Sequence, residues 1–337
     1  MFEVEPILWL QQFSGGWFAG LMWLMSELGR EWVYMPIAML LMFGLRLKPG
    51  MGVVLALVVV GFLNASLKDG LALPRPADVD MRVVDKGEKV RALVANGGGK
   101  QFWSLPSDDA IAAVRAQDDP SFGFVSGHTS TALVVLLSTV LCFSVRNKVI
   151  WALVLIWPLL MGLSRMFLGR HFLADVLGGL VVGTLVSVGA WWLWKQLLSG
   201  DNRARRAEQL ALAASTLLAV LATQVSWLSP GGAGQIIGIL LCLMLLNRWG
   251  WPEDSASLPR RSARLLLAFV LATLVDIASK AGYAAIGLGE AHIAASLIAA
   301  VGFVLALGGS VWLCRLLRLY PSGIAATALP TAELRSR

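Results

Sequence analysis

Long apolar runs, separated by short polar segments, make up most of the chain. A helix needs roughly 20 mainly apolar residues to cross a bilayer core about 30 Å thick. Ten runs approach that length, although Gln11, Gln12 and Ser14 weaken the first of them. The runs lie near residues 7–28, 32–47, 51–72, 126–145, 149–168, 173–195, 208–228, 233–249, 264–286 and 292–319. The pattern predicts an all-α polytopic membrane protein.

One long polar segment, residues 74–122, separates the third apolar run from the fourth. It carries charges of both signs, and Ser107 is placed to cap a short amphipathic helix over residues 108–117. Loops of this length inside a compact domain are usually functional or disordered, and the apolar side chains of this one favour a folded structure. We therefore expect a small lid on one face of the membrane.

The composition excludes several classes of protein. Of the 337 residues, 57% are hydrophobic and 15% are charged, which rules out a water-soluble globule and a disordered chain. Cys142, Cys242 and Cys314 all lie in apolar runs, so they predict neither a disulfide framework nor a metal-ligand cluster.

The formal net charge of +7 is distributed unevenly. If the N-terminus lies on side A, that side carries 16 Lys and Arg against seven Asp and Glu, and the rest of the chain carries 12 against 14. The positive-inside rule then places side A in the cytoplasm. We expect a multi-pass protein of the bacterial inner (plasma) membrane, without a cleaved signal peptide, whose lid faces the periplasm or cell exterior. The basic residues are spread over short loops, which argues against nucleic-acid binding.

Two of the three histidines lie in polar clusters at the ends of runs. His171 precedes Asp175 by four residues, so one helix face carries both, and the carboxylate can fix the imidazole tautomer that leaves one nitrogen free to attack. His128 follows Ser126 and Gly127 at the start of the fourth run. Taken singly, a His or an Asp at a membrane interface is explained at least as well by a solvated helix cap as by a catalytic role.

Three cations fall on the same side of the predicted topology as these histidines. They are Lys68, Arg75 and Arg165, at the exits of the third and fifth runs. Together with free N–H groups at a helix N-terminus, they form a cradle suited to a phosphate dianion. Snorkelling to lipid headgroups explains any one of these side chains, but it does not explain their spacing.

The spacing matches a known three-part signature. Lys68 to Pro76 is similar to K-x6-R-P, Ser126-Gly127-His128 resembles the core of P-S-G-H, and Ser164 to Asp175 matches S-R-x5-H-x3-D. In this order the motifs resemble those of the type 2 phosphatidic acid phosphatase superfamily, membrane relatives of the vanadium haloperoxidases. The resemblance covers roughly residues 10–196. It implies a six-helix phosphatase core over residues 1–200, with the extracytoplasmic lid inserted at 74–122.

The resemblance also implies roles for individual residues. His171 is the expected nucleophile, oriented by Asp175, and His128 is the expected general acid and base. The superfamily works without a metal, so no metal or cofactor is expected. The phosphoryl oxygens are expected to bind Lys68, Arg75, Ser126, the Gly127 amide, Arg165 and, as a weaker assignment, Ser164.

The sequence departs from the signature at one position. Val125 occupies the place of the proline in P-S-G-H, which puts the stiffness of the loop in doubt more than its chemistry. Asp69 and Arg170 flank the motifs without matching their fixed positions, so neither is assigned a role.

Residues 201–337 lie outside the resemblance and are expected to form about four additional transmembrane helices. A packing or dimerisation module is the simplest interpretation, which makes a homodimer possible. Asp276 and Lys280 lie inside the ninth run, where ionisable groups are costly and usually pair or face a cavity. The alternative is a second lipid or substrate site, with Glu290 and His292 nearby.

The leading hypothesis for function is a metal-independent lipid phosphate or diphosphate phosphatase that forms a phosphohistidine. A phosphorylated lipid fits because the motifs lie at the membrane surface. A phosphotransferase using the same site is a close alternative, and a transporter or receptor for a phosphorylated lipid is a more distant one. The sequence does not choose among phosphatidate, undecaprenyl diphosphate and other lipid phosphates.

Overall fold

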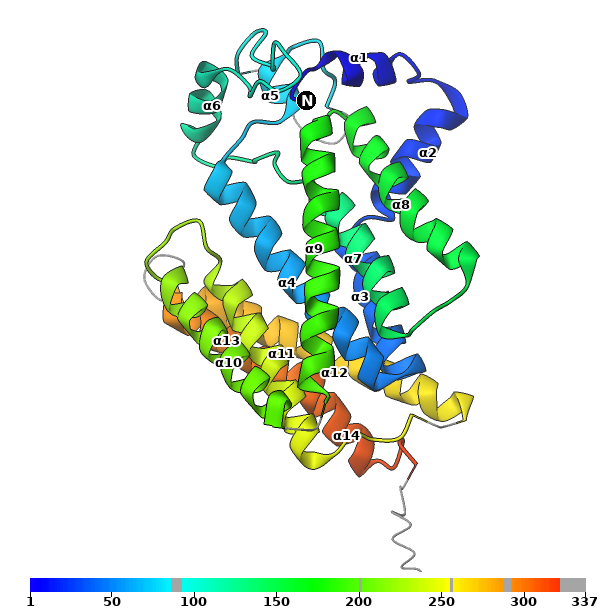
Figure 1. Ribbon diagram of the computed structural model, residues 1–337. Helices are drawn as coiled ribbons and strands as arrows, with labels where there is room; N and C mark the ends of the chain where they lie inside the picture. Colours follow the sequence, from blue (N-terminus) through cyan, green and yellow to red (C-terminus); the bar gives the residue numbers. More distant parts are fainter. Residues whose placement is uncertain (86–92, 200–201, 255–256, 288–291, 322–337) are drawn as a thin grey trace, which may run out of the picture.

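The computed structural model describes residues 1–85, 93–199, 202–254, 257–287 and 292–321, and this part of the chain is helical without strands (Figure 1). The first helices are α1 (Glu5–Gln11), α2 (Gly16–Glu27), α3 (Glu31–Met39) and the π-helix η1 (Leu40–Leu45). The central helices are α4 (Leu47–Leu71), α7 (Gly127–Cys142), α8 (Lys148–Phe167) and α9 (Leu173–Leu197). The C-terminal helices are α10 (Asn202–Ala222), α11 (Pro230–Trp249), α12 (Leu258–Ile286), α13 (His292–Phe303), the π-helix η2 (Val304–Gly309) and α14 (Ser310–Leu316). The all-α membrane fold with additional C-terminal helices is confirmed.

The central helices pack around α7, which contacts α4, α8 and α9. Two glycines let α9 approach the backbone of α7 closely. A Cβ atom on Gly179 would lie 2.7 Å from the carbonyl oxygen of Ser126, and one on Gly183 would lie 2.9 Å from that of Ser130. Small residues at this four-residue spacing permit close helix contact in membranes. They place the N-terminus of α7 beside the start of α9.

The number of membrane spans differs from the sequence prediction. Six described helices are long and apolar enough to cross a bilayer, and α2 with α3 and η1 makes a seventh if that pair, bent by 55°, is one span. The runs 7–28 and 32–47, expected as two spans, thus form one broken path because Gly29 and the charged Arg30 interrupt the helix. Helix α7 is shorter than expected, at 16 residues, and α10 begins in a basic segment that lowers its hydropathy.

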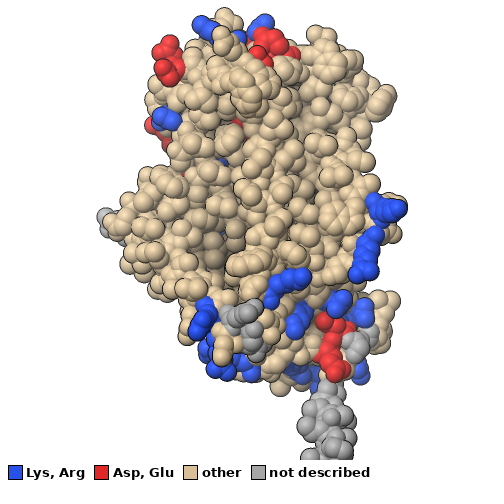
Figure 2. Space-filling view, in the orientation of Figure 1, with Lys and Arg blue, Asp and Glu red and all other residues tan. Residues whose placement is uncertain are grey.

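The N-terminus therefore lies at the lid end of the molecule, and its expected place on side A is wrong (Figure 1). The backbone N–H of Gly99 in the lid donates to the carbonyl oxygen of Phe2 at 2.8 Å. Moving Glu3 and Glu5 to the lid side takes two acidic residues from the count predicted for side A, which makes the predicted charge asymmetry larger. Figure 2 shows the same asymmetry, with Lys and Arg gathered at the end opposite the lid and a broad uncharged band between the two ends.

The described part of the lid, residues 74–85 and 93–122, is folded, as expected. It contains α5 (Pro76–Val79) and α6 (Asp108–Arg115), and the Ser107 hydroxyl accepts a hydrogen bond from the N–H of Ala110 at 3.3 Å, as predicted for an N-cap. The Arg115 guanidinium donates to the carbonyl oxygen of Leu71 at 2.9 Å. This contact fixes the lid to the C-terminal end of α4, where the first motif begins at Lys68.

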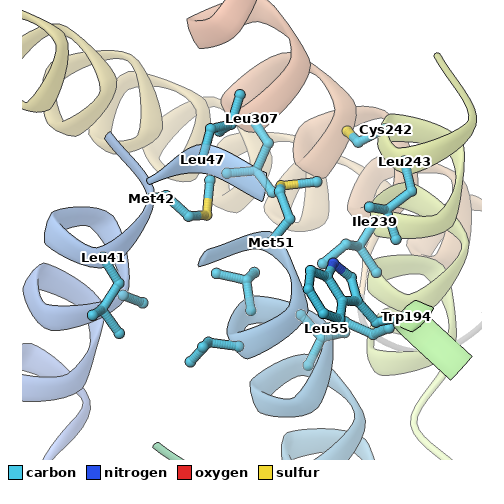
Figure 3. Close-up of a cluster of buried hydrophobic side chains, with 14 of the residues drawn as sticks. Leu41, Met42, Leu47, Met51, Leu55, Trp194, Ile239, Cys242, Leu243 and Leu307 are labelled. Atoms are coloured by element: carbon cyan, nitrogen blue, oxygen red, sulfur yellow. The ribbon is translucent and has the colours of Figure 1, made fainter. Parts of the chain in front are cut away.

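A second apolar core joins the central helices to the C-terminal ones (Figure 3). Met51 and Leu55 of α4 pack with Trp194 of α9, Ile239 of α11 and Leu307 of η2. Because lipid tails are as apolar as these side chains, the cluster stabilises the fold through close packing rather than through removal from water.

The C-terminal module, residues 202–321 in the described part, includes one weakly packed helix. Only 6% of the most apolar stretch of α12 is buried, compared with 67% for α4. The expected ion pair is present, since the Lys280 Nζ lies 2.7 Å from the Asp276 Oδ2, but both side chains are exposed rather than turned into a bundle. Glu290 lies outside the described residues. Residue His292 begins α13, and its side chain is not described.

Candidate active site

Lys68 lies in the last turn of α4, where the chain reverses direction. Ala72 adopts a left-handed conformation, with φ 49°, and its N–H donates to the carbonyl oxygen of Lys68 at 2.8 Å. The turn leads into Arg75, whose Nε donates to the carbonyl oxygen of Ser121 at 3.2 Å. The Arg75 Nη1 also donates to the carbonyl oxygen of Arg170 at 3.4 Å. These contacts hold Arg75 between the lid and the loop that carries His171.

The N-terminus of α7 faces Lys68. A Cβ atom built on Gly127 would lie 3.9 Å from the Lys68 Nζ and 3.6 Å from the Asn64 Nδ2. The Asn64 Oδ1 in turn accepts a hydrogen bond from the Ser130 hydroxyl at 2.9 Å. A positive side chain and the positive end of a helix dipole thus meet at one point, which favours an anion there.

His171 and Asp175 form a buried hydrogen-bonded pair. The His171 Nδ1 lies 3.2 Å from the Asp175 Oδ2, and the side chains are 2% and 0% exposed. The same carboxylate oxygen accepts from the N–H of Phe172 at 2.9 Å. Because a carboxylate only accepts hydrogen bonds, the imidazole carries its proton on Nδ1, and Nε2 keeps a lone pair.

The charge state of His171 follows from its surroundings. Burial lowers the pKa of His171 well below 6.5, and the charges of Arg75, Arg165 and Lys68 lower it further. The imidazole is therefore neutral at physiological pH, as a nucleophile must be. The three cations that lower the pKa of His171 are those of the predicted motifs.

The second motif is tied to the third through the backbone. The N–H of Ser126 donates to the carbonyl oxygen of Asp175 at 2.9 Å. The Ser126 hydroxyl lies 2.9 Å from that of Thr129, and Val125, in the place of the motif proline, is fully buried. These contacts supply packing at the point where proline would have supplied stiffness.

The α2–α3 break contributes contacts that the sequence reasoning missed. The buried Arg165 donates through Nη1 to the Ser26 hydroxyl at 2.5 Å, and its Nε has no hydrogen-bond partner among the described residues. A Cβ atom on Gly29 would lie 2.6 Å from the His128 Cδ2, so the imidazole packs directly on the Gly29 backbone. The only local signal for these contacts is a polar, glycine-containing interruption of an apolar run.

Arg170 also lies at the site, although it matches no motif position. Its Nη1 forms a partly buried ion pair with the Asp85 Oδ2 of the lid at 2.9 Å. The Asp85–Arg170 pair and the Arg75 contact together connect the lid to the loop before α9. All nine candidate residues are thus brought to one end of the helix bundle, beneath the lid.

The site lacks the ligands that a metal ion would need. No group of three His, Cys, Asp or Glu side chains suited to a metal occurs in the described part of the chain. Asp175 is the acidic partner of His171, and the charges that lower the pKa of that histidine most are those of Arg75, Arg165 and Lys68. The donor set suits an anion.

Comparison with known proteins finds a family that resembles this part of the chain. Residues 49–199 match the sequence model described as the PAP2 superfamily. This segment, called the PAP2 segment below, is similar to that superfamily. The resemblance inferred from the three motifs is confirmed, and the PAP2 segment contains every candidate residue. No solved structure matches the chain.

Three curated relatives match parts of the chain. Phosphatidylglycerophosphatase B of Bacillus subtilis is 35% identical over 75 residues, which are 20% of this chain and 37% of that protein. Undecaprenyl-diphosphatase of Sulfolobus acidocaldarius is 26% identical over 169 residues, or 50% and 66% of the two chains. Lipid A 4'-phosphatase of Porphyromonas gingivalis is 34% identical over 82 residues, or 23% and 32%. The chain thus spans between about a third and two thirds of the length of these relatives.

Within the PAP2 segment, Ser164 is expected to be dispensable for catalysis. Its buried hydroxyl donates to the carbonyl oxygen of Met161, one turn earlier in α8, at 2.8 Å. We expect Ser164→Ala to change kcat/KM for a lipid phosphate by less than about threefold, because the substitution removes a hydrogen bond within the helix of about 1 kcal/mol or less. A loss of tenfold or more, with an unchanged unfolding temperature, would instead give the hydroxyl a role at the phosphate.

Proposed function

We propose that the protein is an integral membrane phosphatase for lipid phosphates or diphosphates, which works through a phosphohistidine at His171. The hydrogen-bonded His171–Asp175 pair, buried among three cations, is the observation that carries this proposal. A neutral imidazole with a fixed tautomer is a nucleophile, and cations around it stabilise the charge of a phosphoryl group in transfer.

In the first step, the His171 Nε2 attacks phosphorus, and the bond from phosphorus to the leaving oxygen breaks. The negative charge of the bound phosphate favours the protonated form of His128, and this imidazolium gives its proton to the leaving alkoxide, or to the leaving phosphate of a diphosphate. In the second step, neutral His128 takes a proton from water, whose oxygen attacks the phosphohistidine. The N–P bond breaks, inorganic phosphate leaves, and both histidines return to their starting states.

Five groups are proposed to hold the phosphoryl oxygens through both steps: Lys68, Arg75, Ser126, the Gly127 N–H and Arg165. The unpartnered Nε of Arg165 supports its part in this set, since a buried donor without an acceptor is costly unless a ligand supplies one. The Gly127 N–H lies in the first turn of α7, where helix N–H groups have no acceptor within the helix.

The lipid nature of the substrate is supported by the relatives and by the setting of the site. All three relatives are named for phosphorylated lipids. The site lies at one end of the apolar helix bundle, where a headgroup reaches it while the hydrocarbon tail stays in the bilayer. The excess of cations at the opposite end supports an active site that faces the periplasm or exterior of a bacterial inner membrane.

We also propose that residues 1–200 and 201–337 are separate functional parts. The match to the superfamily ends at residue 199, next to this boundary. The C-terminal module packs against α4 and η1, which favours a supporting role for it in the fold.

The proposed reaction is tested by measuring phosphate release from a panel of lipid phosphates and diphosphates, with purified protein in detergent and excess chelator. We expect release from at least one lipid, and the same rate with and without chelator. Loss of activity on chelation would contradict the metal-free reaction.

Adding an acceptor lipid or polyol distinguishes hydrolysis from phosphotransfer, because transfer yields a phosphorylated acceptor in place of free phosphate. Tight binding without turnover on the whole panel would indicate a transporter or receptor.

A further inference from the structure

A buried arginine lies at the end of the molecule opposite the candidate active site. Arg264, in the second turn of α12, is 1% exposed. Its Nε and Nη1 atoms have no hydrogen-bond partner among the described residues. A guanidinium buried without acceptors is costly, and the catalytic proposal makes no use of this one.

The guanidinium of Arg264 lies over the aromatic ring of Tyr320. The guanidinium carbon lies 4.4 Å from the centroid of the Tyr320 ring, a cation–π contact. The buried Tyr320 hydroxyl also lacks a hydrogen-bond partner within the described chain. The two side chains come from α12 and from the segment after α14, so an acceptor between them would join both elements.

The carboxylate of Asp254 interacts electrostatically with Arg264. The Asp254 Oδ1 accepts from the N–H of Leu47 at 2.9 Å, so this carboxylate caps the start of α4. Burial raises the pKa of Asp254, while the charges of Arg264, Arg46 and Arg261 oppose that rise. A carboxylate that already accepts a hydrogen bond from α4 leaves the unpartnered N–H groups of Arg264 without an acceptor among the described residues, and the oxygens of a phosphate group would supply one.

We propose that Arg264 and Tyr320 bind a phosphate group, carried by an anionic phospholipid headgroup or free in solution. Arginine is the usual side chain for phosphate recognition, and the positive end of the α12 dipole lies within two turns. Lys and Arg gather on this end of the molecule (Figure 2), where they would attract an anionic headgroup. The bound phosphate would link α12, the start of α4 and the segment after α14. This site is separate from catalysis and does not depend on the proposed reaction.

Thermal unfolding of the purified full chain tests the proposal in two comparisons. The first uses nanodiscs of phosphatidylcholine with and without phosphatidylglycerol, and the second uses detergent with sodium phosphate or with sodium chloride at equal ionic strength. We expect the wild-type unfolding midpoint to rise with the anionic ligand. A rise with phosphatidylglycerol alone assigns the site to a headgroup, and a rise in sodium phosphate assigns it to free phosphate as well. No rise in either comparison overturns the proposal.

Two variants distinguish the Arg264 site from general attraction. Arg264→Met is expected to remove most of the rise, leaving only what the catalytic site contributes. It should keep the wild-type midpoint in phosphatidylcholine, because it removes a buried charge with little change in volume. Arg146→Met removes an exposed cation from the same end of the molecule and is expected to retain the full rise. The catalytic site is intact in both variants, so a headgroup held there contributes equally to each.

Two results for Arg264→Met overturn the proposal: a full rise, or a much lower midpoint without any anion, which would make Arg264 purely structural. If Arg264→Met does not fold, Tyr320→Phe decides, since it removes one hydroxyl donor and keeps the ring. A smaller rise in Tyr320→Phe supports the site, and an unchanged rise contradicts it.

Discussion

His171→Ala is expected to lower kcat for lipid phosphate hydrolysis by at least about 10⁴-fold, because it removes the atom that attacks phosphorus. Most of the remaining site is unaffected, since Lys68, Arg75 and Arg165 keep their charges. The KM should therefore change much less than kcat. Steady-state phosphate release over a range of lipid concentrations in mixed micelles measures both constants.

The matched control for this variant is His292→Ala, which removes the third histidine from outside the PAP2 segment. We expect it to retain wild-type kcat, and both variants to retain the wild-type unfolding temperature within a few degrees. Activity within tenfold of wild type in folded His171→Ala would show that another group carries the phosphoryl transfer.

The second large effect is expected for Asp175→Asn, with a loss of about 10³- to 10⁴-fold in kcat. The carboxylate accepts from the N–H of Phe172 and from the Nδ1 of His171. In the variant, the amide oxygen is expected to keep the Phe172 contact, which turns the amide N–H₂ toward Nδ1. The imidazole would then carry its proton on Nε2 and lose the lone pair that attacks.

A charge-matched control separates this tautomer effect from loss of a negative charge. Asp276→Asn removes a carboxylate from the exposed ion pair of α12 and is expected to leave kcat unchanged. A normal rate in folded Asp175→Asn would contradict the orienting role. A loss of activity in Asp276→Asn would give the C-terminal module a part in turnover.

The candidate site was largely predictable because its residues follow fixed spacings at helix ends. Asp175 follows His171 by one helical turn, so their contact is local and the sequence alone predicts it. The convergence of Lys68, Ser126 and His171 followed from the alternating direction of the spans. The three residues do converge, even though the N-terminus lies on the lid side. Merging the first two spans into one changes the side of the N-terminus but not the direction of the later helices.

The contacts that were missed join residues far apart in the chain. Ser26 and Arg165 are separated by 139 positions, and no local pattern relates them. The broken span over residues 16–45 was read as two helices because its length and hydropathy suit either interpretation, and only packing against α4 and α8 decides. The pairing of Arg170 with Asp85 was missed for the same reason, since it joins the lid to the catalytic loop.

The phosphohistidine is tested most directly by trapping it. Wild-type protein, His128→Ala and His171→Ala are mixed with a lipid substrate radiolabelled at phosphorus, quenched in base within one turnover, and separated from the lipid. We predict protein-bound label that is stable in base and labile in acid. The label should accumulate most in His128→Ala with a diphosphate lipid. Its phosphate leaving group departs readily without the general acid, whereas hydrolysis of the phosphohistidine lacks its general base in this variant. The label should be absent in His171→Ala. Label that persists in His171→Ala, or its absence from both other proteins during active turnover, would contradict the account.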